Sequence, residues 1–365
     1  MYYKEYGKTG KKVSAIGMGC MRFNEDDVLK KKHTDIIDMI LYAYEKGINY
    51  FDTAPFYCHD QSEIIVGKAL SQVPRETYFV TSKTNLATLQ HDFSEKGFME
   101  RLEKSLERLK VDYIDFYYIW CMLDDEMLKT NCEVLMPFFE KAKKTGLIRH
   151  VVLSSHMEGK GLNTAIRSGM FDGILVGYNP INYRYRKQGI LEAYNAKLGV
   201  SVMNPLGGGL IPRNPRIFQN LSFGTDNVAQ GVLRSLAEHR EITMVLNGFS
   251  CKQHIDEAVN AVKDLEEKSM DEIQRIYDKG LNVNNPLCTG CGYCNQCPKG
   301  IEIPKFMDAY NEKILGASII TRLRKHWRIS ANEAKKCVKC RKCEQLCTQH
   351  LPIADRLQEI AAIIK

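Results

Sequence analysis

Eight of the thirteen cysteines in this 365-residue chain lie between residues 288 and 347, in two runs of four. The second run has the spacing C-x2-C-x2-C-x3-C, which is typical of bacterial iron–sulfur proteins. The first run is one residue tighter before its last cysteine, and a proline follows it. Thiolates three residues apart on a turning backbone can converge on one cubane, whereas the fourth cysteine of each run points elsewhere. In proteins with two such clusters, that fourth cysteine binds the other cluster.

This spacing predicts two [4Fe–4S] clusters with crossed ligands. One ligand set is Cys288, Cys291, Cys294 and Cys347, and the other is Cys337, Cys340, Cys343 and Cys297. Two zinc sites with four thiolates each are an alternative, because zinc also favours C-x2-C pairs, and free thiols or disulfides are a third. Zinc needs only two such pairs, so the extra C-x2-C step within each run has no role there. The spacing favours clusters, and with them a protein that moves electrons.

The composition is that of an ordinary globular protein, with 44% hydrophobic and 26% charged residues. The N-terminus is polar and has no apolar core of a signal peptide. No stretch approaches the 18 or more apolar residues that a membrane span requires. We therefore expect no membrane association and a cytoplasmic location, where thiols stay reduced.

The formal charge of +7 is unevenly distributed, because residues 288–365 carry 14 Lys and Arg against 7 Asp and Glu. A basic cluster near Trp327 is compatible with nucleic-acid binding; its members are Arg322, Arg324, Lys325 and Arg328. The favoured interpretation is that these cations offset the negative charge of the clusters. They are also compatible with a docking face for an acidic ferredoxin or flavodoxin. We expect no nucleic acid among the partners.

Before residue 288, eight short β-rich runs alternate with stretches of helical periodicity such as Phe98–Leu109 and Val134–Lys144. The eight runs are Val13–Gly19, Ile48–Ala54, Tyr78–Lys83, Tyr113–Trp120, His150–Ser155, Gly173–Asn179, Gly199–Pro205 and Ile242–Phe249. Eight β/α repeats over about 250 residues predict a (β/α)8 TIM barrel.

We expect three parts along the chain: the barrel over residues 1–265, a helical linker over 266–286, and a small domain over 287–365. In that last part, the long spacer between the cysteine runs contains two helix-like stretches, Pro304–Leu315 and Ser318–Trp327. They predict an α-helical, ferredoxin-like domain with two clusters.

The carboxyl ends of the predicted strands carry the side chains that could act on a substrate, because active sites of such barrels gather there. Asp52 and Tyr57 follow the second run, Lys83 ends the third, and Trp120 ends the fourth. A buried ammonium beside a tyrosine would lower its pKa from about 10, and a carboxylate would keep that lysine charged. Such a tyrosine could act as the general acid for a carbonyl oxygen that receives a hydride.

The chain resembles the aldo/keto reductases, specifically the subgroup with a C-terminal ferredoxin-type extension. The resemblance covers essentially the whole chain and rests on an ordered series of motifs. They are KTG at 8–10, GINYFDTA at 47–54 with Tyr57, Ser62-Glu63 with Gly67, TSK at 81–83, SLERL at 105–109, YID at 113–115, Tyr178-Asn179, PLGGG at 205–209 and the cysteine tail. It implies a barrel enzyme that exchanges hydride between NAD(P)H and a small carbonyl or alcohol.

The family's catalytic tetrad is Asp, Tyr, Lys and His, and the first three map to Asp52, Tyr57 and Lys83. Trp120 occupies the histidine's place; its indole N–H can donate a hydrogen bond but cannot relay a proton. His59 and His156 lie in neighbouring loops and are candidates to stand in for the missing imidazole.

The resemblance also implies a set of cofactor contacts in the loops at the carboxyl ends of the strands. The set is Met21, Ser154, Ser155, Met203, Pro205, Leu206, Gly207, Gly208, Gly209, Gly248, Ser250 and Glu257. It departs from the family where Ser155 replaces asparagine, Leu175 replaces the amide-binding glutamine and Met203 replaces a stacking aromatic. Glycines near a helix start suit phosphate groups.

Three functions follow from these residues. The first is an NAD(P)H-linked carbonyl oxidoreductase, although a hydride transfer needs no iron–sulfur cluster. The second is an oxidoreductase in which a flavin such as FMN exchanges single electrons with the clusters and an external ferredoxin; Leu175, Met203 and Trp120 favour it. The third is a non-catalytic electron carrier, and the retained Asp52, Tyr57 and Lys83 argue against it.

Overall fold

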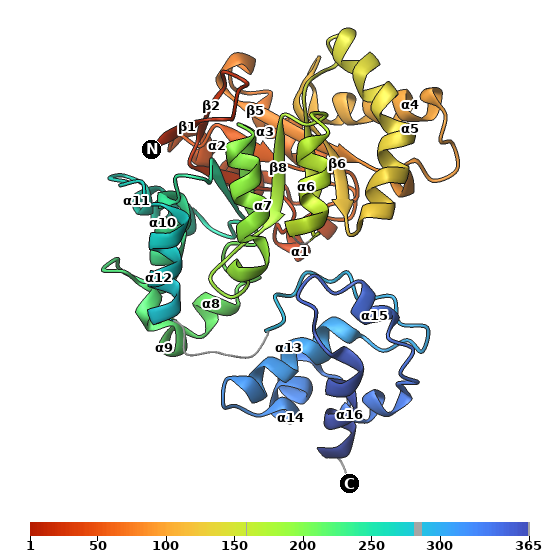
Figure 1. The fold of residues 1–365 in the computed structure, drawn as a ribbon, viewed down its shortest axis with the longest axis vertical. Helices are drawn as coiled ribbons and strands as arrows, with labels where there is room; N and C mark the ends of the chain where they lie inside the picture. Colours follow the sequence, from red (N-terminus) through yellow and green to blue (C-terminus); the bar gives the residue numbers. More distant parts are fainter. Residues whose placement is uncertain (158, 281–286, 364–365) are drawn as a thin grey trace.

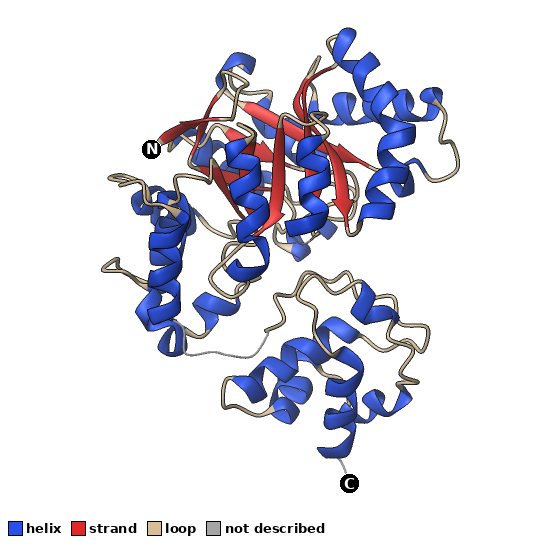
Figure 2. Cartoon of the chain, viewed as in Figure 1, coloured by secondary structure: helices blue, strands red, loops and turns tan. Residues whose placement is uncertain are grey.

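The computed structural model describes residues 1–157, 159–280 and 287–363, and its larger part is a closed barrel of eight parallel strands (Figures 1 and 2). The strand order is β10-β3-β4-β5-β6-β7-β8-β9. The strands are β3 (Ile16–Gly19), β4 (Tyr50–Asp52), β5 (Phe79–Thr84), β6 (Ile114–Met122), β7 (Ile148–Ser155), β8 (Gly173–Gly177), β9 (Gly199–Met203) and β10 (Met244–Asn247). Each of the eight predicted runs overlaps one of these strands, so the predicted barrel is confirmed.

Helices cover the outside of the barrel and bury one apolar face each against the strands (Figure 2). They are α2 (Thr34–Glu45), α3 (Ser62–Leu70), α4 (Glu95–Leu109), α5 (Asp125–Lys144), α6 (Gly159–Arg167), α7 (Tyr183–Asn195), α10 (Val228–Glu238) and α11 (Lys252–Ala261). Helices α4 and α5 begin earlier than their apolar spacing predicted. Ser94 and Asp124 cap their N-termini by accepting hydrogen bonds from Gly97 N and Met127 N.

A small antiparallel hairpin, β1 (Tyr3–Glu5) and β2 (Lys12–Ser14), precedes the barrel. This hairpin was not predicted. The run Val13–Gly19 was expected to be one strand, but it divides at Ala15 into β2 and β3. Tyr6 follows β1 and is fully buried in the floor of the barrel, with its ring 4.6 Å from that of Phe116. Gly199 makes room for this ring, since a Cβ there would lie 2.1 Å from Tyr6 Cε1.

The remaining part of the chain is helical and has its own apolar core. Helix α12 (Met270–Gly280) falls within the expected linker, whose end at 281–286 lies outside the described residues. The helices that follow are α13 (Ile303–Ile314), α14 (Ile319–Thr321) continuing into a π-helical segment (Arg322–Trp327), α15 (Lys342–Gln345) and α16 (Ile353–Ile363). The two helical stretches predicted here are thus confirmed. Of the helices that the structure describes, none is long and apolar enough to cross a bilayer.

The helical domain lies at the carboxyl ends of the barrel strands. In Figure 1 the arrows of β6 and β8 point toward it. Loops at the barrel mouth contact residues 289–293, which connect the first cysteines of the domain. A site at these strand ends is therefore bordered by both parts of the chain.

We predict that Gly199→Ala destabilises the protein by about 2 kcal/mol or more, because the added methyl group would overlap the buried Tyr6 ring. Thermal unfolding of wild type and variant measures the effect. Gly19→Ala is the matched control at the end of β3, where the nearest atom to the new Cβ would be 3.6 Å away. It should unfold at or slightly above the wild-type temperature. Equal melting of Gly199→Ala and Gly19→Ala would contradict the proposed role of Gly199.

Candidate active site

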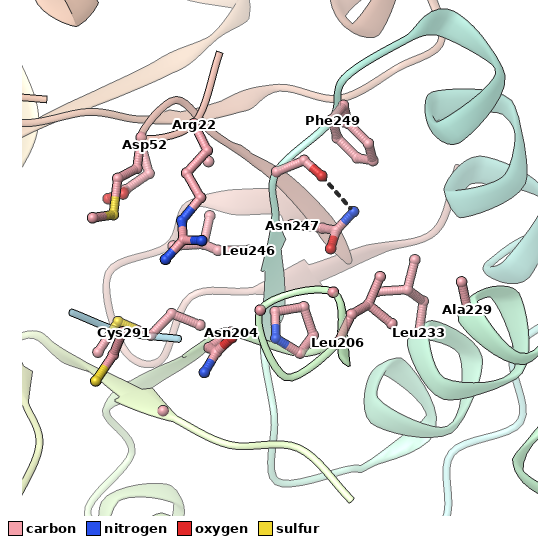
Figure 3. A pocket seen from close by; sticks show the side chains of 18 of the residues that line it. Arg22, Asp52, Asn204, Leu206, Ala229, Leu233, Leu246, Asn247, Phe249 and Cys291 are labelled. Atoms are coloured by element: carbon pink, nitrogen blue, oxygen red, sulfur yellow. Dashed lines mark hydrogen bonds between the residues drawn. The ribbon is translucent and has the colours of Figure 1, made fainter. Parts of the chain in front are cut away.

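The four side chains singled out at the strand ends line one cavity of about 680 Å³. Asp52 is the last residue of β4, Lys83 lies in β5 and Trp120 lies in β6, while Tyr57 belongs to the loop after β4. Residues far apart in the sequence thus meet at the carboxyl end of the barrel, as expected for this fold. Figure 3 shows Asp52 on one side of the cavity and Leu206 and Leu233 on another.

Lys83 and Asp52 form a buried ion pair beneath the cavity. The Lys83 side chain is 1% exposed, and its Nζ lies 2.6 Å from Asp52 Oδ1 and donates to the Thr53 carbonyl at 2.7 Å. Thr81 Oγ1 donates to the same Asp52 oxygen at 3.0 Å. Burial lowers the pKa of Lys83, and the adjacent Asp52 carboxylate opposes that shift. The carboxylate is therefore what keeps an ammonium group in this position.

Tyr57 lies over this pair, with Lys83 Nζ 5.2 Å from the centroid of its ring. The Trp120 ring meets Tyr57 edge-on at 5.6 Å between centroids. Burial raises the pKa of Tyr57 well above its ordinary value, and Asp52 raises it further. The expectation that Lys83 lowers this pKa is thus wrong, because burial outweighs the ammonium. The structure presents Tyr57 as a neutral phenol, which can donate a hydrogen bond.

The loop that carries Tyr57 has an unusual backbone. Four of its non-glycine residues have positive φ: Phe56, Cys58, His59 and Asp60, at 68°, 52°, 53° and 68°. Asp60 Oδ1 accepts hydrogen bonds from Phe56 N at 3.1 Å and from Arg108 Nη1 at 3.2 Å, which hold the loop closed. Next to Trp120, Cys121 has φ of 62° where β6 shifts register. Such conformations cost free energy and gather at functional sites.

The two candidate histidines lie in different places. His59 is exposed, and its Nε2 lies 3.2 Å from Glu25 Oε1, outside the cavity. His156 lines the cavity, and its Nε2 lies 2.9 Å from the Tyr293 hydroxyl. Burial and the nearby Arg186 lower the pKa of His156 to about 3, so its imidazole is uncharged near neutrality. Of the two, only His156 is positioned to act on a molecule in the cavity.

Most of the candidate cofactor residues line the same cavity. They are Met21, Ser154, Met203, Pro205, Leu206, Gly208, Gly209, Gly248, Ser250 and Glu257. Ser155 and Gly207 are not among the lining residues; Ser155 Oγ accepts a hydrogen bond from Met157 N at 3.0 Å. Arg22 and Asn204 were not predicted from the sequence, and Figure 3 shows them around the cavity together with Phe249, which was noted beside Gly248 and Ser250.

The eight tail cysteines form two groups. Cys288, Cys291, Cys294 and Cys347 lie close enough to act on one another electrostatically. Cys297, Cys337, Cys340 and Cys343 surround a small cavity of their own. Within the described residues, no three His, Cys, Asp or Glu side chains could hold a single metal ion. A cubane differs from a single ion because each of its four thiolates binds a different iron.

The first of these groups adjoins the barrel cavity, because Cys291 lines that cavity. Three other residues of the same domain also line it, namely Tyr293, Thr348 and Gln349. Three contacts hold this loop on the barrel. Arg22 Nη2 donates to the Gly290 carbonyl at 2.8 Å, His156 contacts Tyr293, and the Thr289 carbonyl packs against the backbone of Gly208. These neighbours depend on how the two parts dock, so no local sequence signal could have revealed them.

Family models match both parts of the chain. The model described as the aldo/keto reductase family matches residues 15–229, and that of a 4Fe-4S dicluster domain matches residues 287–352. The chain belongs to the aldo/keto reductase family. It is an oxidoreductase of that family with an appended 4Fe-4S domain.

Known relatives agree with this assignment. The chain is 28% identical over 319 residues to an L-galactose dehydrogenase from Arabidopsis thaliana, covering 77% of this chain and 95% of that protein. It is 28% identical over 199 residues to an NADH-specific methylglyoxal reductase from Escherichia coli (strain K12), covering 48% and 57%. The holo form of an aldo-keto reductase from Bacillus halodurans has the same barrel fold, with a TM-score of 0.65 and 22% identity over 77% of this chain and 97% of that one.

We predict that Gly208→Ala loosens the 4Fe-4S domain of this aldo/keto reductase from its barrel. The new Cβ would lie 2.1 Å from the Thr289 carbonyl oxygen, so the loop must move. Hydrogen exchange in residues 289–293 should accelerate, which mass spectrometry measures.

Gly209→Ala is the matched control for this variant. Gly209 also has a positive φ, 84° against 66° for Gly208, but no atom lies within 4 Å of its Cβ position. Both variants therefore carry a similar backbone cost, and only Gly208→Ala adds a clash. Equal exchange in the two variants would show that the Gly208–Thr289 contact does not hold the domains together.

Proposed function

We propose that this enzyme interconverts a small carbonyl compound and its alcohol in the barrel cavity, with NAD(P)H as the hydride donor. The observation that carries the proposal is the buried Lys83–Asp52 pair beneath Tyr57 in a cavity that also reaches the glycine loop at 207–209. Bound nicotinamide would supply or accept the hydride. The protein's own groups would then handle the oxygen and its proton.

Tyr57 is the proposed general acid. Its phenol keeps its proton because its pKa is raised, so it can donate to the carbonyl oxygen and pass the proton as the alkoxide forms. Lys83 stabilises the negative charge left on Tyr57, and Asp52 keeps Lys83 charged. Trp120 meets the Tyr57 ring and can donate its indole N–H to orient the oxygen.

The cavity fits a nicotinamide cofactor in space and in backbone chemistry. Gly209 and Gly248 leave open or ordinary van der Waals room at their Cβ positions, so a ligand can approach the backbone closely. Ser250 lies before α11, and the N-cap residue Cys251 provides no side-chain hydrogen bond to the first N–H groups of this helix. Leu175 and Met203 would give a nicotinamide ring apolar contacts, where the family has an amide-binding glutamine and a stacking aromatic side chain.

The activities of two relatives support a small hydroxy- or oxo-compound as substrate. One is an L-galactose dehydrogenase and the other an NADH-specific methylglyoxal reductase. L-galactose with NAD and methylglyoxal with NADH are therefore the first pairs to assay in anaerobically purified enzyme.

The tail cysteines fit two [4Fe–4S] clusters with crossed ligands, which we also propose. The Cys288 sulfur accepts a hydrogen bond from Gly290 N at 3.5 Å, and the Cys347 sulfur accepts one from Leu351 N at 3.4 Å. Backbone N–H groups directed at ligand sulfurs are a known means of tuning cluster potential. Cys347 lies with the first run, while Cys297 lies with the second.

A second candidate is an enzyme in which a flavin such as FMN occupies the cavity and exchanges single electrons with the clusters. The specific observation in its favour is that Cys291, a proposed cluster ligand, lines the cavity. Anaerobic extraction separates the candidates: a released yellow flavin supports this one, while NAD(P)H binding without flavin supports the first.

An acidic ferredoxin or flavodoxin is the proposed electron partner, in the cytoplasm. Cys340, a ligand in the second group, is exposed, and so is its neighbour Val338 at 57%. The exposed side chains next to it are basic, namely Lys339, Arg341 and Lys342. Positive charge around an apolar contact suits a negatively charged carrier.

We predict that Tyr57→Phe lowers kcat/KM for the active substrate pair by about 100- to 10,000-fold, because the variant has no proton to give. The wild-type rate should not fall between pH 7 and 10 through loss of the Tyr57 proton, since the pKa of Tyr57 is raised above that range. Tyr194→Phe is the control, because Tyr194 is 40% exposed on α7. A Tyr57→Phe enzyme with wild-type turnover would remove Tyr57 from the mechanism.

We predict that Cys347→Ser and Cys297→Ser each reduce the iron content from about eight to about four atoms per chain. The crossed arrangement is tested by pairs of substitutions. Cys347→Ser combined with Cys291→Ser should remove no more iron than either change alone, whereas Cys347→Ser combined with Cys340→Ser should remove nearly all. The exposed Cys251 gives the control, since Cys251→Ser should leave the iron content unchanged. The reverse pattern would mean that each run binds its own cluster.

A further inference from the structure

The loop between two proposed cluster ligands, Cys291 and Cys294, places a tyrosine in the wall of the barrel cavity. Tyr293 lines this cavity together with Tyr57 and Trp120. Its hydroxyl lies 2.9 Å from His156 Nε2, and the two rings meet at 4.8 Å between centroids. Tyr293 therefore belongs to the appended domain by sequence and to the barrel site by position.

Tyr293 and His156 form a polar pair beside the catalytic candidates. The Cys121 thiol, next to Trp120, lies close enough to Tyr293 to affect it electrostatically. Tyr57 and Cys291 are both close enough to affect Tyr293 electrostatically. The pair thus lines the same cavity as the proposed acid and lies near the first cysteine group.

At the end of β6, Trp120 cannot provide both hydrogen-bonding roles of a histidine. Trp120 offers a single N–H donor and no acceptor. A neutral imidazole that carries its proton on Nε2 donates to the Tyr293 hydroxyl, whose own O–H is then free to donate to a substrate oxygen. Arg186 Nη2 donates to the His156 carbonyl at 2.8 Å, which fixes the backbone that presents the imidazole.

Resting on the proposed function, we propose that Tyr293 is a catalytic residue: with His156 it binds the substrate oxygen, so the appended domain completes the barrel's active site. A molecule bound in the cavity then touches the loop that holds Cys291 and Cys294. Substrate binding and the environment of the first cluster are linked through one hydroxyl group.

The test compares Tyr293→Phe, His156→Leu and the double variant with wild type, all loaded with iron and sulfide. Tyr293→Phe keeps the ring and removes only the hydroxyl. Both single variants should lose about tenfold to a hundredfold in kcat/KM for methylglyoxal with NADH or L-galactose with NAD, the effect of one hydrogen bond to a charged intermediate. The double variant should lose no more than the worse single variant, because the two groups act as a unit.

The second measurement is the electron paramagnetic resonance spectrum of the reduced clusters with and without methylglyoxal or L-galactose. In wild type one of these ligands should alter the signal of one cluster, and in Tyr293→Phe the alteration should be absent. Iron content must match wild type in every variant. Tyr185→Phe is the control at the domain interface: its ring lies 5.9 Å from that of His350, yet it does not line the cavity.

The outcomes separate this inference from the proposed function. If wild type turns over a substrate and Tyr293→Phe matches it, the role of Tyr293 is refuted and the proposed function stands. If no turnover occurs but a ligand alters the cluster signal only when Tyr293 is present, the role of Tyr293 stands and the proposed reaction fails. If wild type shows neither turnover nor a ligand-induced change, both are overturned.

Discussion

The buried ammonium group of Lys83 is the constraint on which the rest of the site depends. At 1% exposure it is stable only while Asp52 and the Thr53 carbonyl remain within hydrogen-bonding distance. Both partners come from the end of β4, so the pair fixes β4 relative to β5 and fixes the start of the loop that carries Tyr57. The left-handed residues of that loop persist because this pair fixes its start and Asp60, which accepts from Phe56 N and Arg108 Nη1, closes it.

A buried pair of this kind also requires that water be kept out of the barrel mouth. The strands cannot do this alone, because their carboxyl ends open onto a cavity of about 680 Å³. The 4Fe-4S domain supplies part of the missing wall through Tyr293, Thr348 and Gln349. Low local dielectric strengthens the hydrogen bonds made there, so the appended domain acts on the chemistry of the barrel even before electrons are considered.

The sequence predicted what depends on local pattern and failed where tertiary packing decides. Eight apolar runs were enough to predict the barrel. The motifs were enough to predict that Asp52, Tyr57 and Lys83 share one site. The pKa direction of Tyr57 was wrong because burial, which outweighs Lys83, cannot be seen in spacing. His59 and His156 looked equivalent, since both follow strand ends, and only the fold separates an exposed side chain from one in the cavity. Tyr293 was missed because its place depends on how two domains dock.

The two cysteine groups differ in exposure. Cys340 of the second group is exposed among basic side chains, whereas Cys291 of the first lines the cavity. In the flavin-linked candidate function, one proposed cluster would face a soluble carrier and the other would face the barrel cavity. A carbonyl and its alcohol differ by two electrons, and two clusters that each hold one can store that number. A domain with a single cluster could store only one of them, which gives a physical reason for a dicluster domain at the mouth of this barrel.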